Sequence, residues 1–206
     1  NDRKFAHNID INYISPEELF LGNTGVCLQS YEGFNPMPLL EDISGLCRID
    51  KGDYQEIVLL VGYNACGKTE FCKRFFGNYV RINQEDLGSK VKSLRAVKKA
   101  LFVKESVIVD GLNLDRVDRL DYVNISLGYG VPIRVFWFDF PRELCRHIDE
   151  FRVEKNKGKI KPLDIEKFSV KDLIIPKIQE GFEGIKKINF WWRMNTKDVE
   201  LFLKQY

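Results

Sequence analysis

A glycine-rich run that ends in lysine and threonine is the clearest chemical feature of the sequence. Gly62 is followed, after four residues, by Gly67, Lys68 and Thr69, and the apolar run 57–61 precedes it. The backbone N–H groups of such a loop bind phosphate oxygens at the start of a helix, and the lysine reaches the terminal phosphates. The threonine hydroxyl is placed for Mg²⁺. The run therefore predicts a P-loop whose glycines, lysine and threonine bind ATP or another nucleotide.

An aspartate at the end of an apolar run is a candidate ligand for the metal ion of that nucleotide. Asp110 directly follows residues 107–109, which read as a buried strand. A carboxylate at a strand end holds Mg²⁺ in P-loop proteins, so Asp110 and Thr69 are predicted to share the cation. The alternative is that Asp110 forms a turn with Gly111.

Side chains that could transfer a phosphoryl group lie at two further places in the chain. Glu85 and Asp86 follow the strand-like run 79–82, and either carboxylate could accept the proton of an attacking hydroxyl. Asp86 could instead cap a helix. Arg146 and Arg152 could stabilise charge on the transferring phosphate, although the acids between them oppose that role.

Apolar runs that alternate with helical patterns must position these groups. Continuous apolar strands separated by helices predict an α/β fold with a mostly parallel sheet covered by helices on both faces. Strands are expected at 57–61, 79–82, 107–109, 133–138 and 188–192. Helices are expected at 68–76, 87–104, 115–127, 141–153 and 170–180.

Composition and turn residues predict the domain organisation. Residues 1–50 contain many turn formers and no sustained periodicity, so they are expected to form an appendage to a P-loop domain at 51–206. Five scattered cysteines and two histidines favour neither a disulfide framework nor a zinc site. No apolar run approaches the roughly 20 residues that span a bilayer, which predicts no membrane partner and an intracellular location, in cytoplasm or nucleus.

Two basic segments suggest a polyanionic partner, although the net charge of +2 is too small to indicate one by itself. Within 87–104, which contains no acid, Lys92, Arg95 and Lys99 share one face at helical spacing. The second segment is a loop expected over 152–171, and it includes Arg152, Lys155 and Lys157. Together they predict one surface that binds nucleic acid, RNA more than DNA, or a ribonucleoprotein such as the ribosome. The alternative is a solvated basic face.

The sequence resembles the bifunctional polynucleotide kinase 3'-phosphatases over nearly its whole length. Residues 1–21 are similar to the end of the phosphatase domain of that family, and residues from 58 onward are similar to its kinase domain. The supporting runs are 79–83 with 87–89, 130–132, 146–147, 151–152 and 180–182. The resemblance implies that the α/β fold is of the P-loop kinase-like type, and it implies ATP-dependent phosphorylation of polynucleotide 5'-hydroxyls. It implies no phosphatase activity, because the Asp-x-Asp-Gly-Thr nucleophile motif is absent from this chain.

Several motif positions depart from the family pattern. Where the family has Asn-Arg-Asp, this chain has Asn-Gln-Glu at 83–85, and two lid arginines of the family correspond to Arg146 and Glu150. Glu70 stands where the family has a serine or threonine that contacts phosphate. Each change removes stabilisation of the transition state, so we expect a degenerate kinase that binds nucleic acid and retains part of its nucleotide pocket. An active 5'-hydroxyl kinase is the alternative. A kinase for a small metabolite fits less well, because it would leave the basic segments unexplained.

Overall fold

The structure is a computed structural model that describes residues 52–163, 171–189 and 194–204, with single positions among the first 49. The expected appendage at 1–50 therefore lies almost entirely outside the described residues. Five strands form one sheet in the order β2-β3-β1-β4-β5, and every described strand pair is parallel. The strands are β1 (Ile57–Val61), β2 (Val80–Asn83), β3 (Val107–Asp110), β4 (Ile133–Phe138) and β5 (Gly184–Ile188).

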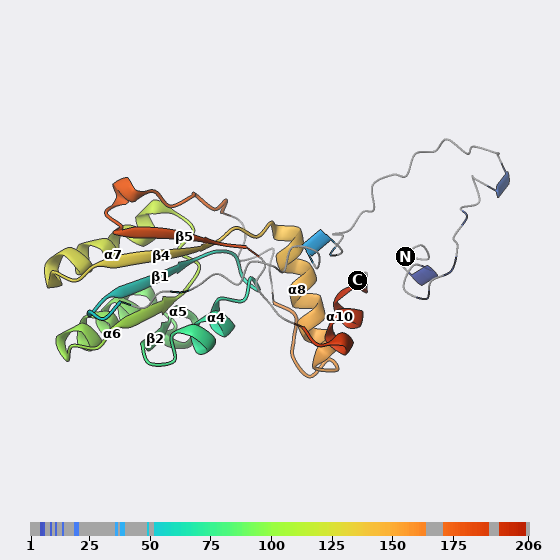
Figure 1. The fold of residues 1–206 in the computed structure, drawn as a ribbon, viewed down its shortest axis with the longest axis horizontal. Coiled ribbons are helices and arrows are strands. Elements are labelled where there is room, and N and C mark those ends of the chain that lie inside the picture. Colours follow the sequence, from blue (N-terminus) through green and yellow to red (C-terminus); the bar gives the residue numbers. More distant parts are fainter. Residues whose placement is uncertain are drawn as a thin grey trace.

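Helices cover both faces of this sheet (Figure 1). They are α4 (Lys68–Phe75), α5 (Gln84–Leu87), α6 (Lys90–Phe102), α7 (Arg116–Tyr129), α8 (Arg142–Lys155) and α10 (Thr196–Phe202), with the one-turn 3₁₀ helix η1 (Ile178–Glu180). Side chains alternate along each strand, so Val58 and Leu60 of β1 join one core cluster with Phe71 of α4. Ile57 and Leu59 join the other cluster, which includes residues of α6 and α7. The predicted α/β P-loop kinase-like fold is confirmed.

The carboxyl ends of the strands form the edge at which the predicted site residues meet. The chain crosses from β1 to β2 on one side and from β3 to β4 on the other, so the strand order reverses between β1 and β3. Ligands of open α/β sheets bind at such a switch point. Helix α8 stands beyond this edge (Figure 1). The fold therefore places the P-loop, Asp110 and α8 around a common space.

Two expected elements were wrong in extent. The helix expected at 87–104 is two helices, because Gly88 has a left-handed φ of 71° and Ser89 then caps α6 by accepting from the N–H of Lys92. The strand expected at 188–192 lies earlier, as β5, and 190–193 are outside the described residues.

The helix expected at 170–180 was also wrong over the part that the structure describes. Residues 171–177 are not helical, and only the single turn η1 follows them. Pro176 lacks a backbone N–H and disfavours a helical conformation in the residue before it. The helices expected at 68–76, 115–127 and 141–153 are confirmed to within two residues at each end. None of the helices in the described ranges combines the length and apolar character that a membrane crossing requires.

Candidate nucleotide and nucleic-acid site

The P-loop makes a tight turn between β1 and α4. Gly67 has a left-handed φ of 85°, which glycine adopts without the steric penalty of a Cβ atom. At Gly62 a Cβ would lie 2.9 Å from the Cβ of Phe138 and 3.0 Å from the Sγ of Cys66, so a side chain does not fit. The N–H of Gly62 donates to the carbonyl of Leu112 at 3.1 Å. This bond ties the loop to the turn that follows β3.

Lys68 is buried inside the loop with its ammonium group on backbone oxygens. Its Nζ donates to the carbonyl of Gly62 at 2.9 Å and to the carbonyl of Tyr63, and it lies 3.5 Å from the Sγ of Cys66. Burial raises the pKa of the Cys66 thiol, so the sulfur stays protonated and adds no negative charge. The lysine therefore supplies a positive charge where the loop can bind phosphate.

Thr69 and Asp110 come together as the sequence predicts. The Thr69 hydroxyl donates to Oδ2 of Asp110 at 2.8 Å, and Asp110 is 3% exposed. A hydroxyl beside a carboxylate fits Mg²⁺, which prefers oxygen ligands and completes its shell with phosphates and water. In the part of the chain that the structure describes, no three His, Cys, Asp or Glu side chains are grouped so as to hold a metal ion. Phosphate oxygens or water would therefore have to complete such a site.

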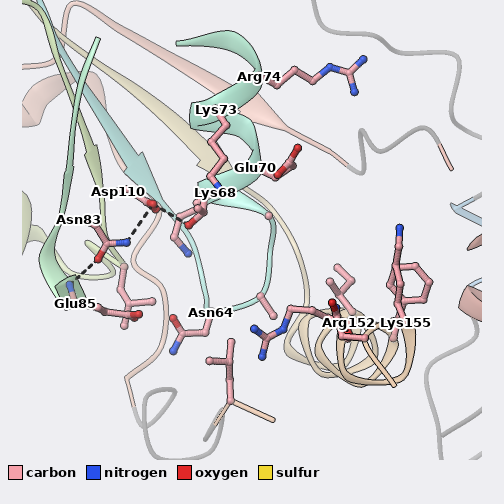
Figure 2. Close-up of a pocket in the computed structure, with 18 of the residues that line it drawn as sticks. Asn64, Lys68, Glu70, Lys73, Arg74, Asn83, Glu85, Asp110, Arg152 and Lys155 are labelled. Atoms are coloured by element: carbon pink, nitrogen blue, oxygen red, sulfur yellow. Dashed lines mark hydrogen bonds between the residues drawn. The ribbon is translucent and has the colours of Figure 1, made fainter. Parts of the chain in front are cut away.

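Arg81 also binds Asp110, and sequence reasoning missed it. Its Nε and Nη2 donate to Oδ2 of Asp110 at 2.8 and 2.6 Å. Asn83 Nδ2 lies 3.3 Å from the same oxygen (Figure 2). Arg81 and Asn83 are two residues apart on β2, and β2 pairs with β3 so that Asn83 lies opposite Asp110. The period of two along a strand is the signal that could have found Arg81.

The two candidate bases separate in the structure. Asn83 caps α5, because its Oδ1 accepts from the N–H groups of Glu85 at 2.7 Å and Asp86 at 3.1 Å. The alternative prediction that Asp86 caps the helix was therefore wrong. The Glu85 side chain lines the cavity next to the P-loop, whereas Asp86 is absent from its lining. Asp86 is 72% exposed and lies 3.7 Å from Nη1 of Arg81.

A cavity of about 660 Å³ extends from Lys68 of the P-loop to Arg152 and Lys155 of α8 (Figure 2), and Asp198 of α10 also lines it. Its cationic lining residues are Lys68, Lys73, Arg74, Arg152 and Lys155. Lys73 and Arg74 were not among the predicted site residues, although each lies one helical turn after a P-loop neighbour, Thr69 or Glu70. Glu70 lines the same cavity and is exposed. The lining thus combines these five cationic side chains with four acidic ones, Glu70, Glu85, Asp110 and Asp198, and Glu70 is the acid on α4 close to the phosphate loop.

Helix α8 presents Arg152 rather than Arg146 to the cavity. Arg146 is 70% exposed, lies 3.4 Å from Glu150 and is absent from the cavity lining. Arg152 lines the cavity, and its Nε and Nη2 donate to Oδ1 of buried Asp149 at 3.0 and 2.7 Å. Asp149 Oδ2 accepts from the N–H of Leu163 at 2.7 Å. Asp149 therefore fixes the arginine that extends toward the cavity in Figure 2.

The described parts of the two basic segments do not form the single surface that we expected. Residues 152–155 of the expected loop belong to α8, and residues 164–170 lie outside the described residues. Lys92, Arg95 and Lys99 are exposed on α6, but α6 and α8 lie at opposite ends of the described fold (Figure 1). Lys155 lines the cavity and pairs with Asp198 of α10 at 2.7 Å, and Lys157 is exposed after the end of α8. The structure thus separates a basic face on α6 from a basic rim on the cavity.

Comparisons with known proteins agree with this architecture. The chain is 31% identical over 194 residues to the bifunctional polynucleotide phosphatase/kinase of Schizosaccharomyces pombe, across 92% of this chain and 47% of that protein. A relative from Acanthamoeba polyphaga mimivirus is 27% identical across 96% of this chain and 50% of its own length. The chain therefore spans about half the length of these curated relatives. No protein-family model matches the chain.

A solved structure supports the fold alone. Chaetomium thermophilum Kti12, solved with ADP-AlF3, superposes with a TM-score of 0.53 and 16% identity, over 71% of this chain and 95% of Kti12. By sequence, the chain is similar to bifunctional polynucleotide phosphatase/kinases over most of its length, and by structure it has the α/β fold of a P-loop kinase.

Proposed function

We infer that this chain binds a nucleotide in the cavity and a nucleic-acid strand at its rim, and that its phosphoryl transfer is weak or lost. The observation that carries the proposal is the continuity of one cavity from Lys68 of the P-loop to the arginine and lysine of α8. Its volume of about 660 Å³ lies within the range of small-molecule sites, about 300–1,000 Å³. Cations along such a cavity favour a phosphate-rich ligand over a neutral metabolite.

Two features support weak transfer. Glu70 brings a negative charge to the cavity next to the phosphate loop, where it opposes bound phosphates. Arg146 and Glu150 pair with each other outside the cavity lining, so the position that the resemblance assigns to a phosphate-binding arginine supplies none. Losing one preorganised donor to a transition state commonly costs about 10²–10³ in rate.

An active ATP-dependent polynucleotide 5'-hydroxyl kinase is the second candidate, and the position of Glu85 favours it. Glu85 faces the same cavity as Lys68, so its carboxylate could accept the hydroxyl proton while Lys68 binds the phosphate. Arg152 could take the role predicted for Arg146, since it faces the cavity. Bound Mg²⁺ on Thr69 and Asp110 would neutralise charge on the phosphates.

The nucleic-acid partner is proposed from the cations of the rim. Lys155 lines the cavity at the end of α8, and Lys157 is exposed just after that helix, so a strand could continue from the cavity along this rim. Cations contact phosphates in RNA and DNA alike. We propose RNA as the polymer and a ribonucleoprotein as the larger partner, and titration of RNA against DNA tests this preference.

The test measures binding and transfer on the same preparations. Fluorescent ATP analogue, single-stranded RNA and single-stranded DNA are titrated against the wild type and Lys68→Ala, and transfer of labelled γ-phosphate to a 5'-hydroxyl oligonucleotide is measured in parallel. The first candidate is supported if Lys68→Ala weakens binding of the nucleotide but not of RNA or DNA, and if the wild type transfers little γ-phosphate. Robust transfer that Lys68→Ala abolishes supports the active kinase. A wild type that binds no nucleotide overturns both.

A further inference from the structure

Arg81 and Thr69 donate to the same carboxylate oxygen, Oδ2 of Asp110. Oδ2 of Asp110 lies within hydrogen-bond distance of four donors: Nε and Nη2 of Arg81, Nδ2 of Asn83 and the Thr69 hydroxyl. An ionised carboxylate has about four lone-pair sites, about two on each oxygen, so four donors around Oδ2 leave that oxygen no free site. Nη2 of Arg81 also lies 3.5 Å from the Thr69 hydroxyl oxygen. The guanidinium therefore lies against both oxygens that fit a divalent cation.

The Arg81 guanidinium and a divalent cation cannot both bind the Asp110 carboxylate and the Thr69 hydroxyl without weakening each other. Asp110 is 3% exposed and the Arg81 side chain is 30% exposed, so solvent screens their charges only partly. Two cations a few ångströms apart repel strongly where the effective dielectric constant is low. Cation binding between Thr69 and Asp110 therefore requires the arginine to move or costs affinity.

Asp86 gives the displaced arginine a second partner. Its Oδ2 lies 3.7 Å from Nη1 of Arg81, whereas Asp110 accepts from Nε and Nη2. Asp86 is 72% exposed and is absent from the cavity lining, so an ion pair with it would leave the site open. The arginine is thus held between a buried carboxylate and an exposed one.

We propose that Arg81 competes with the divalent cation for Asp110 and Thr69, and that loading the cation transfers Arg81 from Asp110 to Asp86. The inference rests on the proposed nucleotide site. It deepens that function by making Arg81 the residue that sets cation affinity. Nucleotide binding by the wild type then depends little on Mg²⁺ until the cation concentration is high enough to displace the arginine.

The first arm of the test uses the cation without any nucleotide. Thermal unfolding of wild type, Arg81→Gln and Asp86→Asn is followed as MgCl₂ is added at constant ionic strength. Arg95→Gln is the matched control, because it removes an exposed arginine of α6. Arg81→Gln should bind the cation at least about fivefold more tightly than wild type, the lower end of common coupling factors. Asp86→Asn should bind it more weakly, because the displaced arginine loses its second partner.

The second arm repeats the titration with a fixed concentration of fluorescent ATP analogue, with EDTA as the zero point. The inference predicts a larger Mg²⁺ dependence of nucleotide affinity in Arg81→Gln than in wild type and Arg95→Gln. Equal cation dependence in wild type, Arg81→Gln and Asp86→Asn overturns it. If Arg81→Gln does not fold, Asp86→Asn decides, since its exposed side chain is tolerant of change. Failure of all proteins to bind nucleotide counts against the proposed function, while the first arm still decides the role of Arg81.

Discussion

Arg119 of α7 and Glu180 of η1 form a two-pronged ion pair in the interior of the protein. Nε and Nη2 of Arg119 each donate to a different carboxylate oxygen at 2.8 Å, and the two side chains are 0% and 7% exposed. Nη1 of the same arginine donates to the carbonyls of Asn113, Leu114 and Ile174. The pair therefore connects the turn after β3, which bonds to the P-loop, with the segment that precedes β5.

Removing this arginine should strongly destabilise the protein. Arg119→Ala leaves Glu180 buried without its partner and the carbonyls of the turn without their donor, which typically costs about 3–5 kcal/mol. Arg116→Ala is the matched control on the same helix, because Arg116 is exposed and should change stability by no more than about 0.5 kcal/mol. Urea unfolding followed by circular dichroism measures both. Equal midpoints for the two variants would show that the pair contributes little.

Protonation of His147 should loosen the contact between α8 and α10. Burial lowers the pKa of His147, and its Nε2–H donates to the carbonyl of Phe202 at 2.6 Å. Because the folded-state pKa lies below the ordinary value of about 6.5, the unfolded chain takes up the proton first as the pH falls. Stability is therefore expected to be complete above about pH 6.5 and to fall below it, by at most about 1.4 kcal/mol per pH unit for one group.

Urea unfolding at pH 7.5, 6.5 and 5.5 tests the role of His147. His147→Gln should remove most of the fall in the free energy of unfolding between pH 7.5 and pH 5.5. His7→Gln is the control, because His7 is the other histidine of the chain, and this variant should show the same fall as the wild type. A wild type whose stability is flat over this range contradicts the assignment.

Neutralising Glu70 should strengthen nucleotide binding. The exposed carboxylate lines the cavity with Lys68 and Thr69, and a like charge in such a solvated site costs about 0.5–1 kcal/mol. Glu70→Gln is therefore expected to raise affinity for the ATP analogue about two- to fivefold. Glu105→Gln removes an exposed acid before β3, at the opposite edge of the sheet, and should have no effect. An unchanged affinity in Glu70→Gln would mean that its carboxylate points away from the bound phosphates.

The two basic surfaces should contribute to nucleic-acid binding independently. One variant changes Lys92, Arg95 and Lys99 to Glu, and another changes Lys155 and Lys157 to Glu. Because α6 and α8 lie far apart, the losses in binding free energy should add within about 0.5 kcal/mol in the combined variant. Each phosphate that a variant no longer neutralises should also reduce the slope of log affinity against log salt by about 0.7 for a single strand.

Fluorescence anisotropy with single-stranded RNA and DNA at several salt concentrations measures these slopes. If the α6 variant keeps the wild-type slope of log affinity against log salt, this would falsify the role of α6, which would then be only a solvated basic face. A wild-type slope in the α8 variant would show that Lys155 and Lys157 do not contact the phosphates of a bound strand. The proposed preference for RNA requires that the wild type bind single-stranded RNA more tightly than single-stranded DNA.

The sequence alone was sufficient to predict the P-loop and the type of fold. Residues 62–69 are contiguous, and the phosphate-binding groups of such a loop are its own backbone N–H groups, so the motif specifies the site locally. Apolar strands alternating with helical segments likewise predict a parallel sheet, because both faces must be buried. The joining of Thr69 and Asp110 followed from the same logic, since the carboxyl ends of parallel strands share one edge.

Only the tertiary structure decided which charged side chains reach that edge. Arg146 and Arg152 are six residues apart, so their directions differ by about 120° around a helix with 3.6 residues per turn. Packing of Ile148 and Phe151 into the core then fixes which arginine faces the cavity. Arg81 meets Asp110 across 29 positions of sequence, through strand register alone. A single sequence carries the period of each element, but the rotation of helices and the pairing of strands depend on packing between distant segments.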